Sequence, residues 1–181
     1  MRIVTPINEG ELPIPAAAGI GVALRQMTDA DLGFAGRVYA STRLEEVAQT
    51  GWPQPMIDAF LAQQHDAQHA HYTAHYPGIR RYAIQHAGAD VGRLYLYEGA
   101  SDLRIVDIAL LPDARGSGIG AALLTDVIAY AQARGLTTSI HVEQQNPARR
   151  LYLRLGFEFE KTANDIYDLL IRHPAPAPVD Q

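Results

Sequence analysis

Three glycines within five residues, at positions 116, 118 and 120, separate a predicted strand from a predicted helix. The strand is the apolar run over residues 103–111, and the helix covers residues 118–134, where apolar side chains recur at every fourth position. Glycine has no Cβ, so such a turn can bend sharply and lie against a ligand. Backbone N–H groups at a helix N-terminus attract anions such as phosphate. The segment therefore predicts an α/β fold with a phosphate site after one strand.

The rest of the chain alternates helices and strands around this segment. Apolar periodicity and breaker residues predict strands over residues 21–27, 79–85, 91–98, 103–111, 136–142, 157–161 and 165–171, and helices over residues 28–47, 55–76, 118–134 and 147–155. Short connections predict antiparallel pairs, whereas the strand–helix–strand unit in the second half predicts a parallel pair. We expect an α/β (α+β) protein, order β-α-α-β-β-β-α-β-α-β-β, with a mixed central sheet of six to seven strands and about four helices on its faces.

Length and composition assign these elements to one domain. The chain has 181 residues, of which 48% are hydrophobic, enough for an ordinary core. Residues 1–19, rich in Pro, Ala and Gly, are expected to form a flexible N-terminal arm. Residues 173–181 repeat Ala-Pro and are expected to form a disordered, Pro-rich tail. The predicted domain is therefore residues 20–172.

Several classes of protein are excluded by composition. The chain has no cysteine, which excludes disulfides, thiolate metal sites and a cysteine nucleophile. Its net charge of −5 lacks the basic footprint of a nucleic-acid-binding protein. No apolar run approaches the ~20 residues that span a bilayer, and Glu9 and Glu11 are unlike a secretory signal. We expect a cytoplasmic protein that binds neither nucleic acid nor membranes.

The glycine segment fits a dinucleotide-binding fingerprint only in part. Gly116-x-Gly118-x-x-Ala121 has the required spacing, and Glu143 ends the next strand, where a ribose-binding acid would lie. However, residues 112–115 separate the first glycine from the strand, and the preceding strands are predicted to be antiparallel. The fingerprint normally opens a parallel βαβ unit directly after its strand. A dinucleotide-dependent oxidoreductase is therefore a remote alternative.

A second family fits better. Arg115-x-x-Gly118-x-Gly120 resembles the phosphate-binding loop of the GNAT (Gcn5-related) N-acetyltransferases, and residues 146–157, Asn-Pro-Ala-Arg-Arg-Leu-Tyr-Leu-Arg-Leu-Gly-Phe, resemble a second motif of that family. The two motifs are separated by one predicted helix and one predicted strand. The resemblance covers residues 103–157 by motif, and the order of elements extends it to about residues 20–172.

This resemblance implies acetyl-CoA as the co-substrate. The glycine-loop amides would hold its pyrophosphate, and Arg115 would add charge or support the loop. The strand before the loop would bind the pantetheine arm through its backbone, much as an added strand does. Asn146 would cap a helix, contact the cofactor, or do both. The residues so assigned are Ile108, Ala109, Leu110, Arg115, Gly116, Ser117, Gly118, Ile119, Gly120, Ala121 and Asn146.

Two residues are candidates for the chemistry. Tyr152 matches the family's general acid, which protonates the departing thiolate; the alternative is an aromatic side chain that packs on the sheet. Asp107 lies in an apolar strand, where alternation gives it the same face as Ile105. A carboxylate in apolar surroundings could serve as the general base for an amine. The alternative for Asp107 is an ion pair with Arg93 or Arg104.

The helix predicted over residues 55–76 is expected to contribute to the acceptor pocket. Its candidate stripe at helical spacing includes Phe60, and a solvated face is the alternative. Its histidines have i, i+4 spacing but lack the third ligand of a metal signature, so we expect no metal site. Trp52, before this helix, is a core residue or a pocket wall. The predicted substrate residues are Trp52, Gln64, Gln68, His71 and His75.

The resemblance implies an enzyme that transfers acetyl directly from acetyl-CoA to a primary amine, on a small molecule or a peptide, in a ternary complex. A non-catalytic acyl-CoA-binding module is the main alternative. Family members are often dimers, so a homodimer is one expectation. Residues 112–155 carry five arginines against three acids, whereas the rest of the chain carries ten basic and seventeen acidic residues. We therefore expect the acidity to lie where the acceptor binds.

Overall fold

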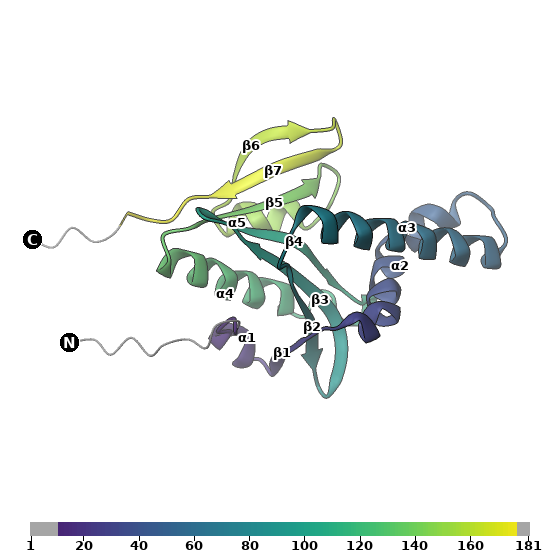
Figure 1. Cartoon of the computed structure of the whole chain (residues 1–181), viewed down its shortest axis with the longest axis horizontal. Helices are drawn as coiled ribbons and strands as arrows, with labels where there is room; N and C mark the ends of the chain where they lie inside the picture. Colours follow the sequence, from purple (N-terminus) through teal and green to yellow (C-terminus); the bar gives the residue numbers. More distant parts are fainter. Residues whose placement is uncertain (1–10, 177–181) are drawn as a thin grey trace, which may run out of the picture.

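The computed structural model describes residues 11–176, and within them seven strands form one twisted sheet (Figure 1). Its order is β1-β2-β3-β4-β5-β7-β6, with β4 and β5 parallel and the other neighbours antiparallel. This confirms the predicted mixed sheet. The strands are β1 (Val22–Gln26), β2 (Arg80–His86), β3 (Ala89–Glu98), β4 (Asp102–Leu110), β5 (Thr137–Glu143), β6 (Glu158–Ala163) and β7 (Tyr167–Arg172).

Helices cover both faces of the sheet. They are α1 (Pro15–Ala18), α2 (Leu32–Ala48), α3 (Gln54–His75), α4 (Ile119–Ala133) and α5 (Arg149–Arg154), with single 3₁₀ turns at Asp29–Asp31 and Pro112–Ala114. Thr28 and Asp31 form a capping box before α2. Gly135, with positive φ, ends α4.

Alternating side chains of the strands pack into two separate cores, one on each face of the sheet. In β3, Leu94 and Leu96 pack with α4, whereas Tyr95 between them packs with α2 and α3. Helices α1 and α4 therefore lie on one face of the sheet, and α2 and α3 lie on the other. A small third cluster joins α2 to α3 away from the sheet, where the two helices project from the body of the molecule (Figure 1).

A β-bulge in β4 changes which face its side chains occupy. Tyr95 pairs with Asp107, but the next residue of β3 pairs with Ile105, so Val106 is the extra residue. Ile105 therefore packs in the α4 core, whereas Val106 packs in the α2–α3 core. Simple alternation, which gave Asp107 the same face as Ile105, is wrong because of this bulge.

Strands β4 and β5 separate after a short parallel ladder. Their pairing runs from Asp102↔Thr137 to Ile105↔Ile140 and ends there. Beyond that point the β5-facing edge of residues 106–110 has no strand partner among residues 11–176, although β3 still pairs with the other edge. The sheet thus opens at one end, directly before the glycine loop.

The N-terminal segment is more ordered than expected from residue 12 onward. Helix α1 is held against α4 by the buried Asp126 carboxylate, which accepts hydrogen bonds of 2.9 Å from the backbone N–H groups of Ala16 and Ala17. Leu12 is buried in the same core. The predicted flexible arm does not hold for residues 12–19, because these contacts offset the cost of ordering them. Residues 1–10 lie outside the described residues.

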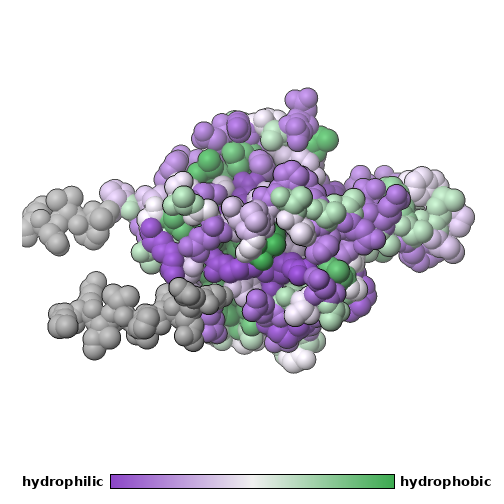
Figure 2. Space-filling view, in the orientation of Figure 1, coloured by the Kyte–Doolittle hydropathy of each residue, from purple (hydrophilic) through white to green (hydrophobic). Residues whose placement is uncertain are grey.

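At the other end, Ala175 exchanges two hydrogen bonds with the Gln132 side chain. Residues 177–181 lie outside the described residues. No helix within residues 11–176 is both long enough and apolar enough to cross a bilayer. On the face shown in Figure 2, hydrophilic side chains dominate and apolar ones are scattered.

Candidate active site

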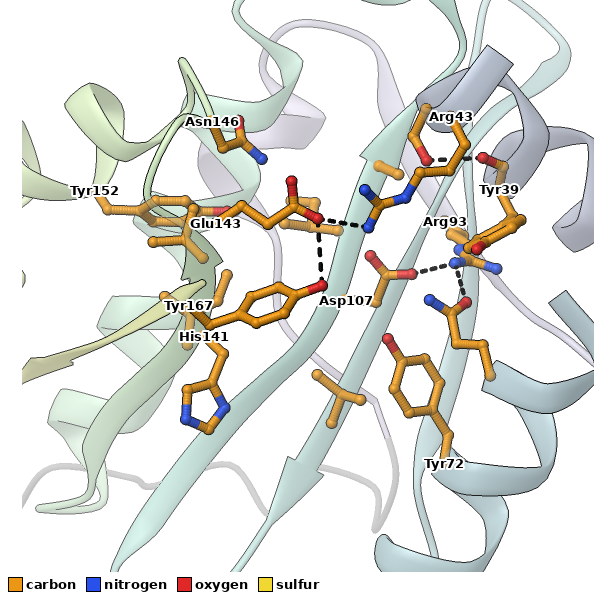
Figure 3. A pocket seen from close by; sticks show the side chains of 17 residues that line it. Tyr39, Arg43, Tyr72, Arg93, Asp107, His141, Glu143, Asn146, Tyr152 and Tyr167 are labelled. Atoms are coloured by element: carbon orange, nitrogen blue, oxygen red, sulfur yellow. Dashed lines mark hydrogen bonds and ion pairs between the residues drawn. The ribbon is translucent and has the colours of Figure 1, made fainter. Parts of the chain in front are cut away.

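A cavity of about 220 Å³ lies where β4 and β5 separate (Figure 3). Its walls come from both sides of the sheet: α2 and α3, the ends of β4 and β5, strand β7, and helix α5. The lining residues are Tyr39, Thr42, Arg43, Gln68, Tyr72, Arg93, Val106, Asp107, Ile108, Ala109, Ile140, His141, Val142, Glu143, Asn146, Tyr152 and Tyr167. Residues from both faces of the sheet therefore meet around one partly open cavity.

Tyr152 enters this cavity from α5. Its ring is only 4% exposed and packs edge-on against Phe157, with centroids 5.6 Å apart. The hydroxyl has no hydrogen-bond partner within residues 11–176, and Figure 3 shows it pointing into the cavity. Burial raises the pKa of Tyr152, and the Asp107 carboxylate raises that pKa further. The phenol is therefore held in its protonated form.

Asp107 faces Tyr152 and is ion-paired with Arg93 of β3. The Arg93 side chain is 2% exposed, and it also donates to the Ala35 carbonyl and, at 2.7 Å, to Gln68 Oε1. Burial opposes the charge on Arg93, but Asp107, together with Tyr95 and Tyr72, outweighs this and the pKa of Arg93 is raised. The sequence leaves two interpretations of Asp107, a general base or an ion pair with Arg93 or Arg104. The structure contains the ion pair with Arg93.

A second ion pair crosses the cavity. Arg43 of α2 lies 2.6 Å from Glu143 at the end of β5, and Tyr167 of β7 donates a 3.2 Å hydrogen bond to the same carboxylate. The contacts join one helix to two strands on the far side of the opening (Figure 3). His141, on the same face of β5, interacts with Arg104. Burial, together with the charges of Arg104 and Lys161, lowers the pKa of His141.

The glycine loop forms an open cradle next to this cavity. Gly116 and Gly118 have φ of +71° and +86°, a left-handed backbone that favours glycine. The N–H groups of residues 116–121 donate to no acceptor within the described part of the chain. A Cβ at Gly116, Gly118 or Gly120 would meet no atom within 4 Å. Free amides around open space at a helix N-terminus fit a phosphate group.

Arg115 supports the backbone of the cradle, and Asn146 supports the turn before α5. Arg115 donates through Nε to the Leu110 carbonyl and through Nη2 to Ser41 of α2, so it braces the loop. Asn146 Oδ1 accepts from Ala148 N at 2.9 Å in the turn before α5, where Ala148 rather than Asn146 is the N-cap, and the Asn146 side chain lines the cavity. Ile108 and Ala109 line the cavity as well, whereas the Ile119 side chain lies in the core.

Most of the predicted substrate residues lie away from the cavity. Of these, Gln68 lines it, but Gln64, His71 and His75 are exposed, and Trp52 packs edge-on against Phe60 at the far end of the helix pair. The expected stripe is displaced around the helix because the face that turns inward follows the buried apolar residues. That face consists of Ile57, Leu61, His65, Gln68 and Tyr72.

Sequence reasoning also missed several lining residues. Tyr39, Arg43 and Tyr72 come from helices whose facing depends on tertiary packing, and Tyr167 comes from the last strand. The sequence signal that could have identified them is the presence of polar side chains on otherwise apolar helix faces. The sequence pattern assigns Glu143 to ribose binding in the dinucleotide alternative, not to this cavity. Within residues 11–176, no group of three or more acidic or histidine side chains is arranged to hold a metal ion.

An opened sheet edge, the adjacent cradle of free amides and the cavity at the opening together fit a protein that binds an extended, phosphate-bearing ligand. The sequence model of the acetyltransferase (GNAT) family matches residues 41–157, more than half of the chain. The chain therefore belongs to this family and is an N-acetyltransferase whose acetyl donor is acetyl-CoA. The dinucleotide-binding alternative is wrong, because antiparallel strands precede the loop and a 3₁₀ turn separates it from β4.

Solved structures have the same fold at low sequence identity. PaiA N-acetyltransferase from Thermoplasma acidophilum, in complex with coenzyme A, has a TM-score of 0.63 and 16% identity over 84% of this chain and 99% of its own. The ribosomal-protein-S18-alanine N-acetyltransferase from Escherichia coli has a TM-score of 0.59 and 16% identity, over 88% of this chain and 98% of its own. A structure from Corynebacterium glutamicum, described as histone acetyltransferase HPA2 and related acetyltransferase, has a TM-score of 0.62 and 20% identity, over 88% of this chain and 99% of its own. Comparison with curated proteins found no match.

Proposed function

We propose that this protein transfers acetyl from acetyl-CoA to a primary amine in a ternary complex, with Tyr152 as the general acid. The observation that carries the proposal is the free Tyr152 hydroxyl in a cavity at the opening between β4 and β5. The open glycine cradle follows the same strand, β4. A cofactor that lies along β4 would thus have its phosphates at the cradle and its reactive end at the tyrosine.

The residues assigned to the cofactor fit an acyl-CoA. The free amides of residues 116–121 would hold the pyrophosphate, and the unpaired edge of residues 106–110 would bind the pantetheine arm by backbone hydrogen bonds. One of these amides would also polarise the thioester carbonyl. Arg115 would act from behind the loop, since its guanidinium is taken up by Leu110 and Ser41.

In the proposed reaction, the bound co-substrate supplies acetyl as a thioester. The acceptor nitrogen forms a bond to the acetyl carbon as the carbon–sulfur bond breaks. Tyr152 gives its proton to the sulfur, and Asp107 is the proposed recipient of the proton that the amine loses, directly or through water. Transfer of that proton back to Tyr152 restores the starting state. No acyl-enzyme forms on cysteine, because the chain has none.

Asp107 is ion-paired with Arg93 and lines the cavity with 18% of its side chain exposed. Such a carboxylate orients an incoming ammonium and keeps the Tyr152 phenol protonated, whether or not it also takes the proton. Asp107→Asn separates these roles. Loss of activity at all pH values supports an electrostatic role, whereas activity that returns at high pH, where the amine is already neutral, supports a role as base.

The deciding experiment measures thiol release from acetyl-CoA with a panel of amines and peptides. Turnover supports the proposal. Tight binding of acetyl-CoA without turnover on any acceptor would instead favour the non-catalytic binding module. We further propose a cytoplasmic location and a homodimer, which cell fractionation and light scattering of the full chain would test.

A further inference from the structure

The charges that an acceptor would meet in the cavity are two carboxylates and one guanidinium. The charged residues that line it are Arg43, Arg93, Asp107 and Glu143. Arg93 is almost fully buried, and its two terminal nitrogens are held by Ala35, Gln68 and Asp107. By contrast, the side chains of Arg43 and Glu143 are each 31% exposed. The cationic group available to a ligand is therefore Arg43.

Arg43 has donors to spare. Its Nη2 lies 2.6 Å from Glu143, and its Nη1 lies 3.6 Å from the exposed Glu46; within residues 11–176 it makes no other ion pair. A guanidinium carries five N–H donors in a planar fork that matches a carboxylate. An anionic group of a ligand could therefore bind Arg43 beside Glu143, or replace it.

We propose that the acceptor is a small amine that also carries a carboxylate, an amino-acid-like molecule whose carboxylate binds Arg43 while its amine lies at Asp107. This inference rests on the proposed function. A purely cationic amine would be repelled by Arg43, and a purely anionic molecule would be repelled by Asp107 and Glu143. A zwitterion places each of its charges beside an opposite one.

The size of the cavity points the same way. About 220 Å³ is below the roughly 300–1,000 Å³ of ordinary small-molecule pockets, and the acetyl thioester must share this space. Helices α2 and α3 cover the acceptor side, and the Arg43–Glu143 pair crosses it. A small amino acid fits this volume and needs only its carboxylate to join the pair.

The test uses matched triplets: alanine, alaninamide and ethylamine, and serine, serinamide and ethanolamine. Calorimetry on the CoA-saturated protein measures binding, and thiol release measures turnover. We expect the amino acids to bind and react about 10- to 100-fold better than the amides or amines, the range that one charge-assisted contact supplies. Arg43→Gln should abolish this preference, Arg43→Lys should retain part of it, and Arg37→Gln, a control on the exposed side of α2, should retain all of it.

Three outcomes would overturn the inference: amides that bind as well as amino acids, absence of binding by all six compounds, or an Arg43→Gln variant that weakens all of them equally. The last result would make Arg43 a structural residue. Thermal melting of each variant checks that it folds. Binding of amino acids without thiol release would contradict acetyl transfer and leave the inference on the ligand standing, so the two failures are distinguishable.

Discussion

Tyr152 combines burial with a free hydroxyl, and the two together suit a proton donor. A buried phenol beside a carboxylate resists ionisation, so it keeps its proton until a strong base develops next to it. The thiolate that leaves the thioester is such a base. Gln68, Arg43, Arg93 and Glu143 around the cavity have protein partners, whereas the Tyr152 hydroxyl has none within residues 11–176.

Replacing Tyr152 by Phe should therefore remove the proton donor and little else. We expect kcat to fall by about 10²- to 10⁴-fold, with the affinity for acetyl-CoA preserved, because the ring contact with Phe157 remains. Tyr97→Phe, on β3 and outside the cavity, is the matched control. Stopped-assay kinetics and calorimetry give the two quantities, and an unchanged kcat would remove Tyr152 from the chemistry.

Gly118 offers a prediction about the cradle. Alanine at its φ of +86° is strained by about 1–2 kcal/mol, and its Cβ would occupy the open space where a phosphate is proposed to bind. Gly135→Ala has a similar strain, at φ +67°, after α4. Both variants should lose stability, but only Gly118→Ala should weaken binding of CoA, by about tenfold or more. Equal CoA affinity in the two variants would contradict the assignment.

At the scale of elements, the sequence predicted what local patterns control. Apolar periodicity and breaker residues locate every strand and the four main helices within a few residues. The bulge at Val106 was not predictable, because it depends on the register between β3 and β4 rather than on β4 alone. The inward face of α3 escaped prediction for a similar reason: polar Gln68 and Tyr72 turn inward only because the cavity lies beneath them.

Asp168 of β7 anchors the start of α5, the helix that carries Tyr152, and the segment between β5 and α5. It is buried and accepts hydrogen bonds from Gln144, Thr162 and Arg149, the first residue of α5, with an ion pair of 2.9 Å to Arg149. Tyr152 lies three residues further along α5. Asp168→Asn removes the charge but not the shape, so α5 should loosen and kcat should fall several-fold.

A double-mutant cycle separates positioning from simple destabilisation. If Asp168 acts through Tyr152, then Asp168→Asn should have almost no effect on the residual rate of Tyr152→Phe. Asp126→Asn, which weakens the attachment of α1 to α4, should lower the melting temperature and keep the rate. Additive losses of rate in the double variant would exclude the positioning role.

At the scale of the molecule, net charge was a poor guide to the acceptor. The acidity outside residues 112–155 suggested an acidic acceptor site, but each cavity carboxylate is matched by an arginine: Asp107 by Arg93, and Glu143 by Arg43. Much of the remaining acidity lies in exposed or peripheral pairs such as Asp29 with Arg81. Whole-chain charge averages over such pairs, and only tertiary contacts reveal which charges a ligand meets.

His65 of α3 packs against α2, and its protonation should couple pH to the stability of the protein. His65 is buried against α2, 5.8 Å from the Tyr39 ring, and a Cβ on Gly36 would lie only 3.3 Å from its Nδ1. Burial, then the charge of Arg93, lowers the pKa of His65 in the folded protein. Below the unfolded value of about 6.5, the unfolded chain therefore binds the proton more readily. The stability that neutral His65 contributes is fully present above that pH, and it declines as the pH falls toward the pKa of the folded state.

Melting temperatures between pH 8 and pH 5 test this coupling. The wild-type protein should lose stability as the pH falls below about 6.5, and His65→Gln should lose less over that interval, because its side chain does not titrate. His69→Gln, on a more accessible part of α3, should follow the wild-type slope, whereas His141→Gln should remove a second share, since the pKa of His141 is lowered in the same direction. Parallel curves for wild type and His65→Gln would show that this contact carries no pH dependence. In that case the acid sensitivity of the molecule would lie in its paired carboxylates, such as Asp31 and Asp90 beside Arg25, whose lowered pKa values place their loss of stability at lower pH.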